Sequence, residues 1–227
     1  MGGVKVLNIS GVTLQEIRFK DGFWRQSANK NAKFLTYRKS MNDLKEYSNQ
    51  INEEVTAVLS RVDRGQVENF LQLIQGARRI ALYGGGREGL MIRALAMRLF
   101  HLGYEVSVAG DMTAPFLTNG DLLILSVGPG YVATIDALRS VAQRDGATVV
   151  CLTAQTDGKT SRAADEIVYL PAQTMADDTE GKATSVLPMG GLFELVLFVF
   201  GEIVVLELLK RSGRTFGEAR DRHTNLE

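Results

Sequence analysis

The sequence predicts an α/β protein in which about five parallel strands form one sheet between two layers of helices, a three-layer sandwich of the flavodoxin-like or Rossmann-like kind. Three observations lead to this fold class. Short apolar runs alternate with helical patterns from about residue 42 onward, the runs are apolar at successive positions, and glycine-rich segments follow the first and third of them. Strands that are buried on both faces read as such continuous runs, and the connecting helices cover them.

Two helices are predicted before the first strand, because apolar side chains recur there at spacings of three, four and seven. The first spans about residues 42–60, and the second spans 64–75 and stops at Gly76. Such amphipathic helices can cover the sheet or pair with a second subunit. With the long C-terminal helix they carry more apolar surface than one sheet needs, so we predict a homodimer or homotetramer.

Strands and helices then alternate along the chain. We predict strands at residues 79–83, 105–109, 121–127, 148–153 and 166–170. The helices between them are expected at about 90–102 and up to about 146, and Pro188 opens a long helix that reaches about residue 211. Residues 172–186 are polar and read as a long loop.

The chain reads as one domain, residues 41–227, preceded by a basic N-terminal arm, residues 1–40. Basic and acidic residues balance at 26 each in the 227-residue chain, but the arm holds eight basic and two acidic residues and therefore a net charge of +6. The arm lacks a sustained period, so we predict that it is poorly ordered. Its interleaved basic and aromatic residues make a nucleic-acid arm the alternative, but without a long basic run we expect no nucleic-acid partner.

We expect a cytoplasmic protein without disulfides or membrane spans. Cys151 is the single cysteine and lies in an apolar run, which predicts a buried structural thiol. The N-terminus lacks the apolar segment of a secretory signal. Residues 195–209 form the most apolar stretch, but Glu202 and Glu207 interrupt it, so it predicts a buried core helix.

The first glycine-rich segment follows a predicted strand and reads Gly84-Gly85-Gly86-Arg87-Glu88-Gly89. In open parallel sheets a ligand binds beyond the carboxyl ends of the strands, where the strand order reverses. At Gly84 and Gly86, backbone N–H groups can approach a polar ligand, and Arg87 adds a cation for a phosphate or an enediolate oxygen. A solvated pair of Arg87 and Glu88 at a helix start is the alternative.

The same string satisfies G-x-G-x-x-G, so a dinucleotide site is a second alternative. The acidic residue that such a site needs should end the second strand. Asp111 stands near the expected distance but beyond Gly110. We therefore expect no cofactor.

Four separated segments form recognisable motifs. They are the segment 83–89, "AMRLFHLG" at 96–103, "PMGGLFE" at 188–194 and the terminal "RHTNLE" at 222–227. These motifs resemble those of the 6-phospho-3-hexuloisomerases, members of the sugar isomerase (SIS) family. The resemblance runs in one order from about Asn42 to Glu227 and is closer still to plant-type SIS-family sugar isomerases, which carry strings similar to "GREGLM" and "PAQTMA". It implies a SIS fold and a sugar-phosphate ligand.

The second glycine-rich segment departs from the family pattern. The hexuloisomerases have a Ser-Gly-Ser-Gly-Glu-Thr-like loop whose hydroxyls hold the sugar phosphate, whereas residues 126–134 here read SVGPGYVAT. Gly128 and Gly130 align, and Ser126 and Thr134 keep hydroxyls nearby. We therefore expect an anion to rest on backbone N–H groups at 130–134, the helix dipole and these two hydroxyls.

Glu88 is a second departure, because the family has a serine after the arginine of the first loop. A carboxylate placed there would repel a phosphate dianion, but it can accept hydrogen bonds from sugar hydroxyls. The resemblance therefore leaves open whether the natural sugar carries a phosphate.

Isomerisation needs a base that moves a proton between carbons and an acid that protonates oxygen. Glu194 matches the family's glutamate in "PMGGLFE", and a carboxylate among apolar neighbours has the raised pKa of a general base. A surface acid in the first turn of a helix is the alternative. His223 in the terminal motif matches a histidine that can reach a neighbouring subunit's site, or it is a tail residue in solvent. His101 lies in an apolar helix stripe, either packed or lining the site.

The predicted function is a sugar-phosphate isomerase, most like 6-phospho-3-hexuloisomerase, with Glu194, His223 and Arg87 as catalytic residues. Two histidines and one cysteine far apart give no metal site. One alternative is a non-catalytic SIS module that binds a sugar phosphate as a sensor or regulator. Another is an isomerase for a different sugar without phosphate.

Overall fold

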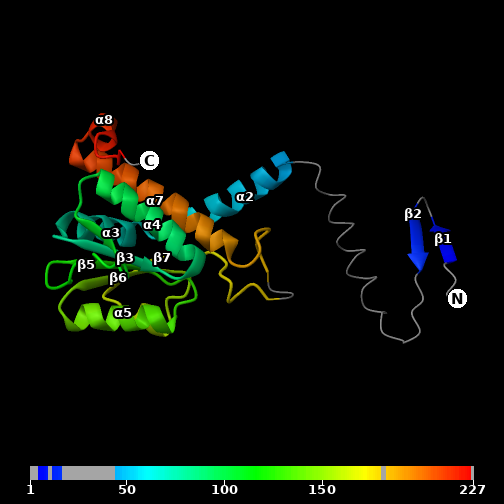
Figure 1. Cartoon of the computed structure of the whole chain (residues 1–227), viewed down its shortest axis with the longest axis horizontal. Helices are drawn as coiled ribbons and strands as arrows, with labels where there is room; N and C mark the ends of the chain where they lie inside the picture. The colour runs from blue at the N-terminus through cyan, green and yellow to red at the C-terminus, as the bar shows by residue number, and fades with distance from the viewer. Residues whose placement is uncertain (1–4, 10–11, 17–43, 180–182, 226–227) are drawn as a thin grey trace. The chain divides into compact units, whose positions relative to one another are not determined.

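The computed structural model describes residues 5–9, 12–16, 44–179 and 183–225, and the chain divides into two units, Met1–Tyr47 and Ser48–Glu227 (Figure 1). In the first unit, β1 (Lys5–Ile9) pairs antiparallel with β2 (Val12–Glu16). The sequence pattern predicted no regular element here, because five-residue strands are too short to show a clear period. Residues 17–40 of the predicted arm lie outside the described residues.

The predicted α/β domain begins with α2, whose residues from Ser48 onward belong to the second unit. Its elements are α2 (Leu44–Leu59), α3 (Arg64–Gly76), β3 (Ile80–Gly84), α4 (Gly86–His101), β4 (Val106–Val108), β5 (Leu122–Ser126), α5 (Ala133–Arg144), β6 (Thr148–Thr153), α6 (Lys159–Ala163), β7 (Glu166–Tyr169), α7 (Gly191–Ser212) and α8 (Phe216–Arg220).

The second unit contains one sheet with the strand order β4-β3-β5-β6-β7, and every neighbouring pair is parallel. The prediction of about five parallel strands flanked by helices is therefore confirmed. The chain places β4 on one side of β3 and β5 on the other, so the strand order reverses at β3 and β5. Gly84 lies opposite Ser126 in the register, so the glycine-rich segments that follow these strands start side by side.

Two apolar clusters, one on each face of the sheet, account for the continuous apolar strands. Leu122 and Ile124 of β5 pack with α3, α4 and α7, whereas Leu123 and Leu125 pack with α5. Figure 1 shows α5 on one side of the sheet and α4 and α7 together on the other. Successive strand residues point to opposite faces, so both sets must be apolar when both faces are covered.

Two helices that frame the glycine-rich segments start elsewhere than the sequence pattern predicts. Helix α4 starts at Gly86 rather than near residue 90, because Gly86 has a φ of 54° and turns the chain directly into the helix. Helix α7 starts at Gly191 rather than at Pro188, since Met189 and Gly190 both adopt left-handed φ values that interrupt a helix. The short helices α6 and α8 were not predicted.

Helices α4 and α7 run in the same direction. Arg87 pairs with Glu194 at their first turns and Arg98 pairs with Glu202 two to three turns later. Both helices therefore begin at the carboxyl edge of the sheet, beside the glycine-rich segments. In the part of the chain that the structure describes, no helix combines the length and apolarity that crossing a bilayer requires.

Cys151 lies in β6 and is completely buried, as predicted. Burial in this apolar layer raises the pKa of its thiol to about 12. The thiol therefore stays protonated and unreactive in the folded protein.

Candidate functional site

The first turn of α4 and the first turn of α7 bring Arg87 and Glu194 together. The Nε atom of Arg87 lies 3.0 Å from Oε2 of Glu194, and the Glu194 side chain is 13% exposed while that of Arg87 is 69% exposed. The N–H of Arg87 is not directed at this oxygen, so within the described residues Oε2 is buried without an aligned hydrogen bond. Burial raises the pKa of Glu194, and the charge of Arg87 opposes this rise.

Glu88 turns toward the second glycine-rich segment. Its Oε2 accepts a hydrogen bond of 2.6 Å from the hydroxyl of Ser126, and the N–H of Gly128 donates to the same carboxylate at 3.1 and 3.3 Å. Burial raises the pKa of Glu88, these two hydrogen bonds lower it, and the nearby charge of Glu194 raises it further. The solvated Arg87–Glu88 pair that the sequence left open does not form, because each side chain has another partner.

The second glycine-rich segment uses its own polar groups internally. The N–H of Gly130 donates to the carbonyl of Val127 at 2.8 Å, and the carbonyl of Gly130 accepts from the N–H groups of Thr160 and Ser161 at the start of α6. Ser126 is buried and its hydroxyl is committed to Glu88. Of the predicted anion-binding groups, Ser126 and the N–H of Gly130 are therefore occupied.

Thr134 stands apart from this network, exposed in the first turn of α5. A basic side chain that sequence reasoning missed lies close to the same turn. The Nζ atom of Lys159 is 3.0 Å from Oδ2 of Asp136 and 5.2 Å from the centre of the Tyr131 ring. The sequence did contain an indication of Lys159. This residue follows β6, the fourth strand of the sheet along the chain, and so lies at the edge where parallel sheets generally bind ligands.

A polar network, also missed from sequence, fixes the segment between β7 and α7. Asp177 accepts hydrogen bonds from Thr174 at 2.8 Å and from Gln155 at 3.2 Å. In the same segment, the carbonyl of Gln173 accepts a hydrogen bond of 3.3 Å from the N–H of Phe193, next to Glu194. The predicted loop at 172–186 therefore lies next to the start of α7, which carries Glu194. Its polar residues alone gave no indication of these hydrogen-bond partners.

The two histidines lie together, away from Arg87 and Glu194. His101 is buried near the end of α4, and its ring centre is 5.0 Å from that of His223. His101 lies fourteen positions after Arg87 in α4, about 21 Å along the helix at the usual helical rise. The structure therefore brings Arg87, Glu88 and Glu194 into one place in this chain and leaves His101 and His223 at the opposite end of α4.

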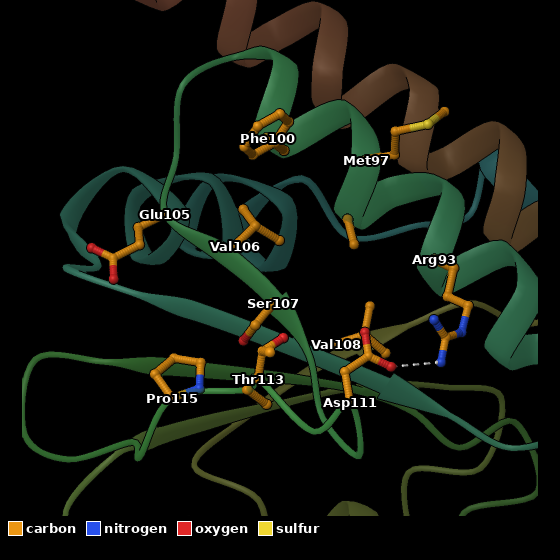
Figure 2. A pocket seen from close by; sticks show the side chains of 12 residues that line it. Arg93, Met97, Phe100, Glu105, Val106, Ser107, Val108, Asp111, Thr113 and Pro115 are labelled. Carbon is orange, nitrogen blue, oxygen red and sulfur yellow. Dashed lines mark hydrogen bonds and ion pairs between the residues drawn. The ribbon is translucent and has the colours of Figure 1, made fainter. Parts of the chain in front are cut away.

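A cavity of about 550 Å³ lies at the edge of the sheet, along β4 rather than at the glycine-rich segments. Figure 2 shows Met97 and Phe100 of α4 on one side of β4, Ser107 on β4 itself, and Thr113 and Pro115 on the other side. The described residues contain no cluster of histidine, cysteine or acidic side chains that could hold a metal ion.

Comparison with known proteins connects this geometry to a family. Residues 73–196 match the SIS domain. The chain is 36% identical over 177 residues to a 3-hexulose-6-phosphate isomerase from Mycobacterium gastri, covering 78% of this chain and 88% of that protein. It is 29% identical over 182 residues to a 3-hexulose-6-phosphate isomerase from Bacillus subtilis, covering 80% and 98%.

A solved structure gives the same result. A hypothetical protein from Methanococcus jannaschii, whose structure was interpreted as that of a 3-hexulose-6-phosphate isomerase, is 26% identical and superposes with a TM-score of 0.70. The match covers 80% of this chain and 99% of that protein. The resemblance found in the motifs is thereby confirmed, and the chain belongs to the SIS domain family.

Proposed function

We propose that this protein is a sugar-phosphate isomerase that interconverts a 3-hexulose 6-phosphate and fructose 6-phosphate through an enediol. The observation that carries the proposal is the buried carboxylate of Glu194, held beside the guanidinium of Arg87 where the strand order reverses. The 36% identity to a 3-hexulose-6-phosphate isomerase over most of both chains supports the same reaction.

The proposed chemistry assigns one role to each group. Glu194, whose pKa is raised by burial, takes the proton from C2 of the 3-hexulose, and the electron pair forms a double bond between C2 and C3. The C3 oxygen becomes negative, and the side chain of Arg87 stabilises it. Glu194 then returns its proton to C3, the C3 oxygen gains a proton and the C2 oxygen loses one, which gives the 2-ketose. The phosphate lies at the first turn of α5, with Thr134 and Lys159.

Deuterium exchange tests this proposal directly. Fructose 6-phosphate incubated with the protein in deuterated water should gain deuterium at C3, seen by NMR, because the 2,3-enediol exchanges that position. Exchange at C1 instead would identify a 1,2-isomerase and contradict the proposal. Saturable binding of fructose 6-phosphate without any exchange would favour a sensor, a function consistent with the occupied donors of Ser126 and Gly128.

We further propose that two subunits share each site and that His223 of a second copy supplies the oxygen-directed acid. Within one chain, His223 packs on His101 at the far end of α4 and cannot serve Glu194. The exposed apolar side chains of α4 and α7 provide a surface for a second copy. They are Leu90, Met97, Phe100, Phe198, Ile203 and Leu206.

Mixing two inactive variants should therefore restore activity. In a dimer with shared sites, refolding Glu194→Gln together with His223→Ala in equal amounts leaves about a quarter of all sites intact. We expect about a quarter of the wild-type exchange rate from the mixture and almost none from either variant alone. A mixture that stays inactive, or an active His223→Ala variant, would remove His223 from the mechanism.

A further inference from the structure

Glu88 occupies donors that a bound anion would otherwise use. In the corner between the two glycine-rich segments, the hydroxyl of Ser126 and the N–H of Gly128 both point at the Glu88 carboxylate, at 2.6 and 3.1 Å. The fit is tight, because a Cβ atom on Gly128 would lie 2.8 Å from Oε1 of Glu88 and 2.9 Å from the ring of Phe193. The carboxylate of Glu88 therefore already occupies the position that a bound anion would take between these two donors.

What the corner still offers to a ligand is acceptor capacity. The two donors converge on Oε2 of Glu88, so Oε1 shares only the longer branch of the Gly128 bond at 3.3 Å. Nearby, Oε2 of Glu194 is buried without an aligned donor among the described residues. Ionised carboxylate oxygens accept hydrogen bonds and donate none, and phosphate oxygens do the same, whereas a sugar hydroxyl donates.

The local charge points the same way. Two carboxylates, Glu88 and Glu194, lie near each other, and the guanidinium of Arg87, which pairs with Glu194, is largely exposed to solvent. The Glu194 charge is close enough to raise the pKa of Glu88. A phosphate dianion placed here would be repelled by the two carboxylates. It would also find the hydroxyl of Ser126 and the N–H of Gly128 already bonded to Glu88.

We propose that Glu88 determines the specificity of the site by excluding phosphate from the Ser126–Gly128 corner and accepting a hydrogen bond from a sugar hydroxyl there. The inference rests on the proposed function in that the ligand is a sugar phosphate. The role of Glu88 then determines the orientation of the sugar phosphate in the site. The hydroxyl-bearing, reacting end contacts Glu88 and Glu194, and the phosphate end lies away from them.

The test uses two ligands, one that has only the phosphate group and one that has only the sugar hydroxyls. Inorganic phosphate and fructose are titrated by calorimetry into the wild-type protein, Glu88→Gln and Glu207→Gln. Glu207→Gln makes the same charge change near the far end of α7. Removing the like charge should tighten phosphate binding about tenfold in Glu88→Gln. Replacing an ionised acceptor with a neutral one should weaken fructose binding about fivefold. Glu207→Gln should change neither affinity.

Ser126→Ala keeps the Glu88 carboxyl group but removes the hydroxyl that positions it, so it tests the placement of the carboxyl group. This variant should bind fructose more weakly and inorganic phosphate with unchanged affinity. If Glu88→Gln does not fold, the affinities of Ser126→Ala test the proposal. Any of three results would overturn the inference. The phosphate affinities of Glu88→Gln and Glu207→Gln could be equal, the affinities for phosphate and fructose could shift equally, or neither ligand could bind.

The outcomes also separate this inference from the proposed function. Exchange at C3 with no opposite response of the two ligands would leave the isomerase and remove the role of Glu88. Opposite responses without any exchange would keep the role of Glu88 and remove the isomerase.

Discussion

Replacing Glu194 with glutamine is expected to lower the rate of deuterium exchange at C3 of fructose 6-phosphate about a thousandfold, a typical loss for a positioned general base. Glutamine has nearly the same shape, so the packing around Phe193 and the start of α7 should persist. The affinity for fructose 6-phosphate should change much less than the rate. NMR exchange rates and calorimetric affinities of the variant and the wild type measure both quantities.

Glu202→Gln is the matched control. Glu202 pairs with Arg98 at 3.2 Å, so it also joins α7 to α4, but it lies two turns beyond Glu194 and away from the glycine-rich segments. This variant should keep the wild-type rate. If both variants lose the same activity, the Arg–Glu pairs act by holding the helices together, and Glu194 is not the base.

The pH dependence of the exchange rate gives a second readout of Glu194. The base must be ionised, so kcat/KM should rise with pH through the pKa of Glu194. Burial raises that pKa above the ordinary 4.5, with Arg87 opposing the rise and the Glu88 carboxylate nearby, so the acid limb should lie above pH 4.5. The same limb should be missing from the residual activity of Glu194→Gln.

The second large effect concerns stability. Gly158→Ala should destabilise the protein by about 3 kcal/mol, at the upper end of the usual cost of overpacking. The φ of Gly158 is −61°, so alanine suits the backbone. The obstacle is contact, because a Cβ atom would collide with the backbone of Gly130, including its carbonyl oxygen. That carbonyl accepts hydrogen bonds from Thr160 and Ser161, so the collision also disturbs α6.

Gly76→Ala provides the comparison, since Gly76 ends α3 and a Cβ atom there would meet nothing within 4 Å. It should be neutral or stabilise by about 0.5 kcal/mol through the unfolded chain. Urea unfolding followed by circular dichroism measures both variants. Equal midpoints for Gly158→Ala and Gly76→Ala would show that the second glycine-rich segment can shift away from α6 without cost.

The sheet was predictable from sequence because its signal is local. Each strand buried on both faces is a short apolar run, and Leu122–Ser126 shows this most clearly. Helix starts were less predictable where glycine decides them. At Gly86 and Gly190 the backbone φ, rather than the apolar pattern, sets the boundary.

The position of the candidate site at one edge of the sheet was predictable, but the hydrogen-bond partners of its side chains were not. The strand-order rule located Arg87, Glu88 and the second segment correctly at one edge of the sheet. That Ser126 donates to Glu88, across 38 positions of sequence, depends on where a first-turn side chain points, and no periodicity reports it. His223 shows the same limit, because its neighbour in this chain is His101 rather than the site.

The two outer strands of the sheet have a consequence for association in solution. Strand β4 has three residues and lies between the side chains of α4 and the segment around Thr113 and Pro115 (Figure 2). At the other end, the N–H of Tyr169 in β7 is taken by the side chain of Gln66. Short or capped outer strands are poor templates for an added strand from another molecule. The sheet is thereby protected at both ends against the edge-to-edge growth that leads to aggregation.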